Sequence, residues 1–120
     1  MGLTFIDAIV GSAAARPKRA RVRLLVDSGA LYSVLPARIW KALKLKSKRT
    51  VEFDLADGTS IARGVGEVRF VIAGVDAVSP VVLGDEKDAA LVGAVTLESL
   101  GLMLNPLSRE VLPMRMLLAR

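Results

Sequence analysis

Short apolar runs alternate with polar positions and turn residues along most of the chain, which is typical of a β protein. Leu3 to Val10 and Ala20 to Val26 are predicted strands that pair as a hairpin around a small-residue and proline turn. Further predicted strands are Thr50 to Leu55, Ser60 to Gly66, Glu67 to Ala73, Val78 to Leu83, Leu102 to Leu104 and Glu110 to Leu118. Asp57 and Gly58, between the first two of these, predict a tight hairpin turn.

Two segments carry helical signals instead. Leu35 to Leu45 has apolar residues at helical spacing behind Pro36, which suits a first helical turn. Thr96 predicts the N-cap of a second helix, Leu97 to Leu100, which ends at Gly101. The predicted fold class is therefore mainly β, a small closed or sandwich-like fold of about eight strands with two short helices.

Composition limits the possible chemistry. The 120 residues, 52% apolar and 24% charged, fit a single globular domain over residues 1–120. The absence of Cys and His excludes disulfides, Cys/His zinc sites and Ser-His or Cys-His catalysis within the chain. An enzyme of this composition would rely on carboxylates. A chain without cysteine fits the cytoplasm, and no apolar stretch is long enough to predict a transmembrane helix.

Positive charge is concentrated in residues 16–49, which hold eleven Lys and Arg and only one acid, Asp27. Such a segment can bind nucleic acid or an anionic membrane. However, these basic residues alternate with apolar ones, as they would on the solvent face of a strand, and few aromatic residues lie among them to stack on bases. We therefore expect a solvated face and neither a nucleic-acid nor a membrane partner.

Asp27 has an unusual position among the acids. It follows the apolar run Leu24 to Val26 at the end of a predicted strand and precedes Ser28, Gly29 and Ala30. Its apolar surroundings predict a carboxylate held away from bulk water. Gly29 permits a tight turn and the Ser28 hydroxyl can tie the loop to a neighbour, so Asp27 would be presented at a fixed point. The simplest alternative is an ordinary Asx or Ser turn after a strand.

Three further segments follow this loop along the chain. They are the Pro36 helix, the hairpin from Leu55 to Thr59, and the apolar run Ala90 to Gly93 before a short helix. Over roughly residues 3 to 113, this order resembles the retropepsin-like aspartic proteases, in particular small single-domain bacterial and archaeal members. The resemblance implies a small closed β-barrel with one or two short helices, and an endopeptidase in which Asp27 is the catalytic carboxylate.

The resemblance also implies roles for the neighbouring residues. Ser28, Gly29 and Ala30 would support the loop, Asp57, Gly58 and Thr59 would lie at or near a substrate-binding flap, and Leu91, Val92 and Gly93 would back the loop from behind. Aspartic proteases use two carboxylates, and the chain has a single Asp-Ser/Thr-Gly motif. The resemblance thus implies a homodimer that acts on extended peptides without a metal or cofactor. Its interface is expected at Val111 to Leu118, whose apolar side chains suit a partner surface, and a plain core strand is the open alternative for this segment.

Three alternatives remain open. The chain could be a catalytically idle relative of the same fold that dimerises or binds peptides. It could be a basic β-barrel that binds nucleic acid through residues 16–49, in which case binding would depend steeply on salt. It could also be a β domain with a purely structural role, in which case it would be a persistent monomer.

Overall fold

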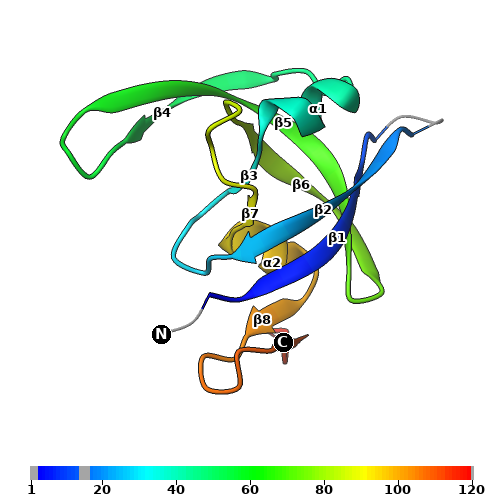
Figure 1. Ribbon diagram of the computed structural model, residues 1–120. Coiled ribbons are helices and arrows are strands. Elements are labelled where there is room, and N and C mark those ends of the chain that lie inside the picture. Colours follow the sequence, from blue (N-terminus) through cyan, green and yellow to red (C-terminus); the bar gives the residue numbers. More distant parts are fainter. Residues whose placement is uncertain (1–2, 14–16, 120) are drawn as a thin grey trace.

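The computed structural model describes residues 3–13 and 17–119 (Figure 1). Its elements are β1 (Phe5–Gly11), β2 (Arg19–Val26), β3 (Ser33–Leu35), α1 (Ala37–Ala42), β4 (Arg49–Asp54), β5 (Ser60–Ile72), β6 (Val75–Leu83), β7 (Leu91–Val92), α2 (Ala94–Ser99), β8 (Leu102–Leu104) and β9 (Val111–Pro113). The predicted mainly β class with two short helices is confirmed. Within residues 3–13 and 17–119, no helix is long and apolar enough to cross a membrane.

The strands form a closed ring. They are hydrogen-bonded in the order β1-β2-β7-β3-β6-β5, and β5 returns to pair with β1 at Ile9 to Gly11. β4 extends the sheet beyond β5, so the β4–β5 hairpin projects from the ring (Figure 1). β8 and β9 form a separate two-stranded sheet at the other end of the molecule. The ring matches the closed β architecture expected from the sequence.

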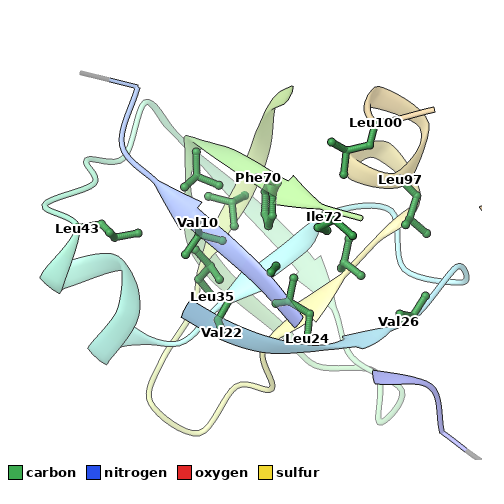
Figure 2. Packing of buried hydrophobic residues seen from close by; sticks show 14 of the residues in the cluster. Val10, Val22, Leu24, Val26, Leu35, Leu43, Phe70, Ile72, Leu97 and Leu100 are labelled. Carbon is green, nitrogen blue, oxygen red and sulfur yellow. The ribbon is translucent and has the colours of Figure 1, made fainter. Parts of the chain in front are cut away.

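The hydrophobic core fills this ring because alternate residues of each strand point inward (Figure 2). In β2, Val22, Leu24 and Val26 are buried, whereas the alternating arginines Arg21 and Arg23 are exposed. Phe70 of β5 is fully buried among the side chains from facing strands. β1 and β2 pair antiparallel as predicted, from Phe5 opposite Leu25 to Gly11 opposite Arg19.

The two strands predicted at Ser60 to Gly66 and Glu67 to Ala73 are one continuous strand, β5. Gly64 and Gly66 do not break it. A Cβ on Gly66 would lie 2.9 Å from the Lys46 carbonyl oxygen, so these glycines allow the segment before β4 to approach the strand closely. Ala73 and Gly74, both with positive φ, form the turn between β5 and β6. β6 begins at Val75, three residues before the predicted start at Val78.

The helix predictions need two corrections. α1 is shorter than Leu35 to Leu45, because Leu35 ends the strand β3 and pairs with β6 instead. Thr96 is not an N-cap: α2 begins at Ala94 behind Gly93, and Thr96 lies fully buried inside it. Gly101 does end this helix region, with φ 68°.

The strand predicted at Glu110 to Leu118 is also too long. Only β9, Val111–Pro113, is a strand, and it pairs with β8 as a short hairpin whose turn contains Asn105. One further backbone hydrogen bond follows Pro113, from the Met114 N–H to the Gly101 carbonyl at 2.7 Å, and the strand pairing ends there. The residues that follow, up to Ala119, are not in a strand and are largely exposed.

Candidate active site

Asp27 is the first residue after β2, and backbone hydrogen bonds fix its position. Its N–H donates to the Val92 carbonyl at 3.0 Å, which extends the β2–β7 pairing by one residue. Its Oδ1 accepts the Gly29 N–H at 3.0 Å, and its carbonyl accepts the Ala30 N–H at 3.2 Å. This is an Asx-type turn whose carboxylate keeps its second oxygen, Oδ2, available for other contacts.

The loop lies open to solvent in the single chain. Asp27 is half-buried, and Ser28 and Gly29 are exposed. The expectation that Asp27 is held away from bulk water is therefore only partly met, because Asp27 is half-buried in a loop whose next two residues are exposed. Within the part of the chain that the structure describes, no hydrogen bond joins the Ser28 side chain to another residue.

The segment Leu91 to Gly93 lies directly beside this loop, where its strand β7 pairs with the end of β2. β7 runs parallel to β2 and antiparallel to β3, so it is inserted between the two strands that flank the loop. The first amides of α2 then hold the far side of the loop: Ala94 N–H donates to the Ala30 carbonyl at 2.8 Å, and Val95 N–H donates to the Leu31 carbonyl at 3.0 Å. These donors have no partners within their own helix.

Gly93 allows this close backing. A Cβ at this position would lie 2.7 Å from the carbonyl carbon and oxygen of Tyr32 and 2.9 Å from the Ala30 oxygen. Its φ of −102° is accessible to any residue, so space rather than backbone conformation is what requires glycine here.

A chain of buried hydroxyl groups anchors the same point, and the sequence analysis missed it. The Gly93 N–H donates to Ser33 Oγ at 3.0 Å, and Ser79 Oγ donates to the Pro80 carbonyl at 3.1 Å. Thr96 Oγ1 lies within hydrogen-bond distance of both Ser33 Oγ and Ser79 Oγ. Each hydroxyl has one hydrogen. Ser33 therefore donates to Thr96, which donates to Ser79, and every member of the chain is satisfied.

No local signal could have revealed this chain, because its members come from β3, β6 and α2. Ser33, Ser79 and Thr96 are each at most 1% exposed. Their role follows only from the way that the strands and the helix meet in the folded ring. The chain fixes the end of β7, whose last carbonyl holds the Asp27 amide.

Asp57, Gly58 and Thr59 form the predicted tight turn at the tip of the β4–β5 hairpin. Gly58 has φ 87°, and the Leu55 N–H donates to the Thr59 carbonyl at 2.8 Å. Asp57 Oδ1 accepts the Thr59 hydroxyl at 2.6 Å and the Thr59 N–H at 2.9 Å. These two hydrogen bonds, the hydroxyl one first, lower the pKa of the Asp57 carboxyl. The tip is exposed in the single chain.

An apolar groove of about 620 Å³ lies between this hairpin and the loop after Asp27. Its residues come from the end of the Asp27 loop, from both arms of the hairpin and from β3, β6, β7 and the segment before β7. They are Ala30, Leu31, Tyr32, Val34, Val51, Phe53, Ile61, Arg63, Val82, Asp88, Ala89 and Leu91. The groove begins at Ala30, three residues after Asp27. Asp27 is not itself a lining residue, so the loop that holds its carboxylate joins the groove through Ala30.

The family model for the aspartyl proteases matches residues 13–104, more than half of the chain, and includes the Asp27 loop, the hairpin and the backing segment. The chain belongs to the aspartyl protease family. Among solved structures, the Simian Foamy Virus (mac) protease matches with a TM-score of 0.58 and 16% identity, over 78% of this chain and 91% of that one. At this identity the likeness shows the fold. No match was found among curated proteins.

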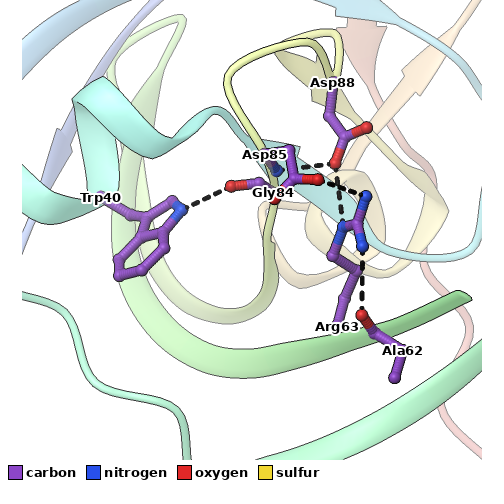
Figure 3. A network of polar contacts seen from close by, with 6 residues as sticks. All are labelled: Trp40, Ala62, Arg63, Gly84, Asp85 and Asp88. Carbon is purple, nitrogen blue, oxygen red and sulfur yellow. Dashed lines mark hydrogen bonds and ion pairs between the residues drawn. The ribbon is translucent and has the colours of Figure 1, made fainter.

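Two arginines tie the hairpin of this aspartyl protease chain to the walls of the groove. Arg49 of β4 donates to the Tyr32 hydroxyl at 2.8 Å, and its guanidinium lies 5.8 Å from the centre of the Tyr32 ring. Arg63 of β5 forms ion pairs with Asp85 at 3.0 Å and Asp88 at 3.1 Å (Figure 3). Both arms are therefore fixed at their bases, whereas the tip extends beyond them.

The basic residues of β2 lie where the alternation predicted. Arg19, Arg21 and Arg23 are exposed at alternate positions, and the guanidinium of Arg23 lies 4.5 Å from the centre of the Phe5 ring. None of the three forms an ion pair with a described carboxylate. Across residues 3–13 and 17–119, no three acidic side chains gather closely enough to hold a metal ion.

Proposed function

We propose that this aspartyl protease chain is an endopeptidase that hydrolyses peptide bonds as a homodimer. The observation that carries the proposal is the Asp27 carboxylate, fixed by the Asx turn and the Val92 carbonyl in a loop whose last residue, Ala30, lines an apolar groove. Membership of the family supports peptide hydrolysis as the reaction. Asp27 would be the catalytic carboxylate, with Ser28, Gly29 and Ala30 as its supporting loop.

The need for two carboxylates supports the homodimer. The chain has one Asp-Ser-Gly loop, and that loop is exposed on a single chain. A two-fold axis through this loop would bring the Asp27 residues of two protomers together and cover both loops at once. The exposed Ser28 hydroxyl would then find its partner in the other protomer.

The proposed mechanism follows from placing two carboxylates side by side. Two such groups about 3 Å apart cannot both ionise, so the pair holds one shared proton and titrates as a unit. The ionised Asp27 takes a proton from a water molecule, while the protonated Asp27 of the partner subunit polarises the scissile carbonyl. The water oxygen bonds to the carbonyl carbon to give a diol. Proton transfer to the amide nitrogen then breaks the C–N bond.

The substrate would bind extended along the groove, between the loop and the β4–β5 hairpin, by strand-like backbone hydrogen bonds. Asp57, Gly58 and Thr59 at the hairpin tip would act as the flap over it. Because the dyad must keep one proton, we expect activity to be highest at mildly acidic pH. The reaction requires no metal or cofactor.

Peptide cleavage by the wild type and Asp27→Asn tests the proposal directly. A mixed peptide library is incubated with each protein between pH 4 and 7, and products are identified by mass spectrometry. The wild type should cleave, and Asp27→Asn should not, although the amide retains an Oδ1 that can accept the Gly29 N–H. Cleavage by neither folded protein would reject the endopeptidase and favour the alternative of an idle dimerising or peptide-binding module.

Sedimentation velocity tests the homodimer separately. We propose that the segment Val111 to Leu118 contributes to the interface, because its last residues leave large apolar side chains exposed: Leu117 is 95% and Leu118 86% accessible. The double variant Leu117→Ser/Leu118→Ser should shift a wild-type dimer toward monomer and reduce cleavage in parallel. A wild type that stays monomeric at all concentrations that allow cleavage would contradict the homodimer.

A further inference from the structure

The apolar groove contains two charged side chains, Arg63 and Asp88, and they pair with each other. Arg63 comes from the hairpin arm β5, and Asp88 comes from the segment between β6 and β7 (Figure 3). The Arg63 Nε donates to Asp88 Oδ2 at 3.1 Å. A positive charge in a binding groove would ordinarily attract acidic side chains, so the position of Asp88 bears on which side chains the groove accepts.

Three of the five N–H groups of the Arg63 guanidinium donate hydrogen bonds within the chain. Each of its three nitrogens donates one hydrogen bond: Nε to Asp88, Nη2 to Asp85 and Nη1 to the Ala62 carbonyl. The Arg63 side chain is only 18% exposed. An incoming carboxylate would have to displace Asp88 from a half-enclosed site, and a partly buried charge that loses its partner is costly.

Asp88 does not depend on Arg63 alone for its position. Its Oδ2 also accepts the Asp85 N–H at 2.8 Å, and a Cβ on Gly84 would lie only 2.9 Å from that same oxygen. The Trp40 indole N–H donates to the Gly84 carbonyl at 2.8 Å and fixes the segment from the α1 side. Burial opposes ionisation of Asp88, but the Asp85 N–H and the Arg63 guanidinium outweigh it and lower its pKa.

We propose that Asp88 is a specificity-determining residue: within the groove lining it occupies the Arg63 Nε–H and adds a second negative charge to that of Asp85, and it thereby reserves this part of the groove for uncharged side chains. Without the Asp88 charge, the Arg63 Nε–H loses its carboxylate partner in the groove and can pair with an acidic side chain of the substrate. This inference rests on the proposed peptidase function, because it specifies which substrates the same groove accepts.

The test compares peptides that differ at one position, with Val, Gln or Glu scanned through the sites flanking the scissile bond. For each position, kcat/KM gives a Glu-to-Val ratio. The wild type should prefer Val. Asp88→Asn, which preserves the shape of the side chain, should raise the ratio at least tenfold at one position. The matched control Asp85→Asn removes the other carboxylate that pairs with Arg63, outside the groove lining, and should leave the ratio within twofold.

A double variant tests whether Arg63 is the source of any rise in the Glu-to-Val ratio. Adding Arg63→Met to Asp88→Asn should return the Glu-to-Val ratio to the wild-type value, with the folded state checked by circular dichroism. An unchanged ratio in folded Asp88→Asn, or a wild type that already prefers Glu at the same position, would overturn the inference while leaving the peptidase intact. If the wild type cleaves none of the peptides, their dissociation constants are measured by NMR titration. The same shift in binding preference would support the role of Asp88 in specificity but not the peptidase function. The absence of binding would reject both the role of Asp88 and the peptidase function.

Discussion

Deleting one hydroxyl of the buried chain behind the Asp27 loop should destabilise the protein far more than deleting an exposed one. The substitution Thr96→Val keeps the size of the side chain and removes Oγ1, the atom shared by Ser33 and Ser79. The Ser33 hydroxyl then loses its acceptor in a site with no access to solvent, whereas Ser79 still donates to the Pro80 carbonyl.

The expected magnitude follows from this hydrogen-bond chain. One buried donor left unsatisfied costs about 1–3 kcal/mol, and the lost bond to Ser79 adds about 0.5–1.5 kcal/mol. A loss of about 2–4 kcal/mol is a large part of the stability of a domain of this size. It should lower the melting temperature by about 6–15 °C.

Thermal and urea denaturation at one fixed protein concentration would measure this loss, since a dimer makes stability depend on concentration. Hydrogen exchange should also become faster at the Gly93 amide, which donates to Ser33, and at the Asp27 amide beyond it. The control is Ser99→Ala, which removes a hydroxyl bonded to Val95 on the exposed face of the same helix and should cost under about 0.5 kcal/mol. If Thr96→Val cost no more than Ser99→Ala, the role assigned to the chain would be refuted.

Two further predictions concern the loop backing and the hairpin tip. Gly93→Ala should cost about 1–3 kcal/mol, because its Cβ would lie 2.7 Å from the Tyr32 backbone; unchanged Asp27 and Ala30 amide resonances would contradict the displacement that we expect. The pKa of Asp57 is lowered in the folded chain, so its contribution to the turn is present above the unfolded pKa and lost as pH falls through the lower folded value. The Thr59 amide resonance should therefore titrate with a midpoint below 3.8, and a midpoint at or above 3.8 would exclude these hydrogen bonds in solution.

Local patterns predicted the parts of the fold that depend on local physics. Alternation in β2 identified its buried face, and the Asp57–Gly58 dipeptide identified the β4–β5 turn, because Gly58 adopts a positive φ that few other residues tolerate. The Asp27 loop was identified for a similar reason. An acid directly after an apolar strand and before Ser-Gly forms a turn of its own, with the Gly29 amide bound to the carboxylate.

The errors occurred where a distant segment decides the local structure. The segment Ser60 to Ala73 was predicted as two strands divided after Gly66, but it is one continuous strand in which Gly64 and Gly66 allow the segment before β4 to approach. Thr96 had the residue type of an N-cap, but its hydroxyl satisfies partners from β3 and β6 rather than its own helix. A single sequence shows that such a residue is present but not what surrounds it.

The same reasoning explains why the candidate site was predicted only in part. Asp27 could be selected from its immediate neighbours, whereas the pairing of Arg63 with Asp88 joins residues 25 positions apart, one from β5 and one from the segment before β7. The turn that presents the carboxylate is encoded within four residues, so it can be recognised in isolation. The wall that faces the substrate depends on how the hairpin β4–β5 folds back toward the segment before β7. Substrate preference in this chain is therefore a tertiary property, and substitutions at Asp88 should alter it without altering the Asp27 turn.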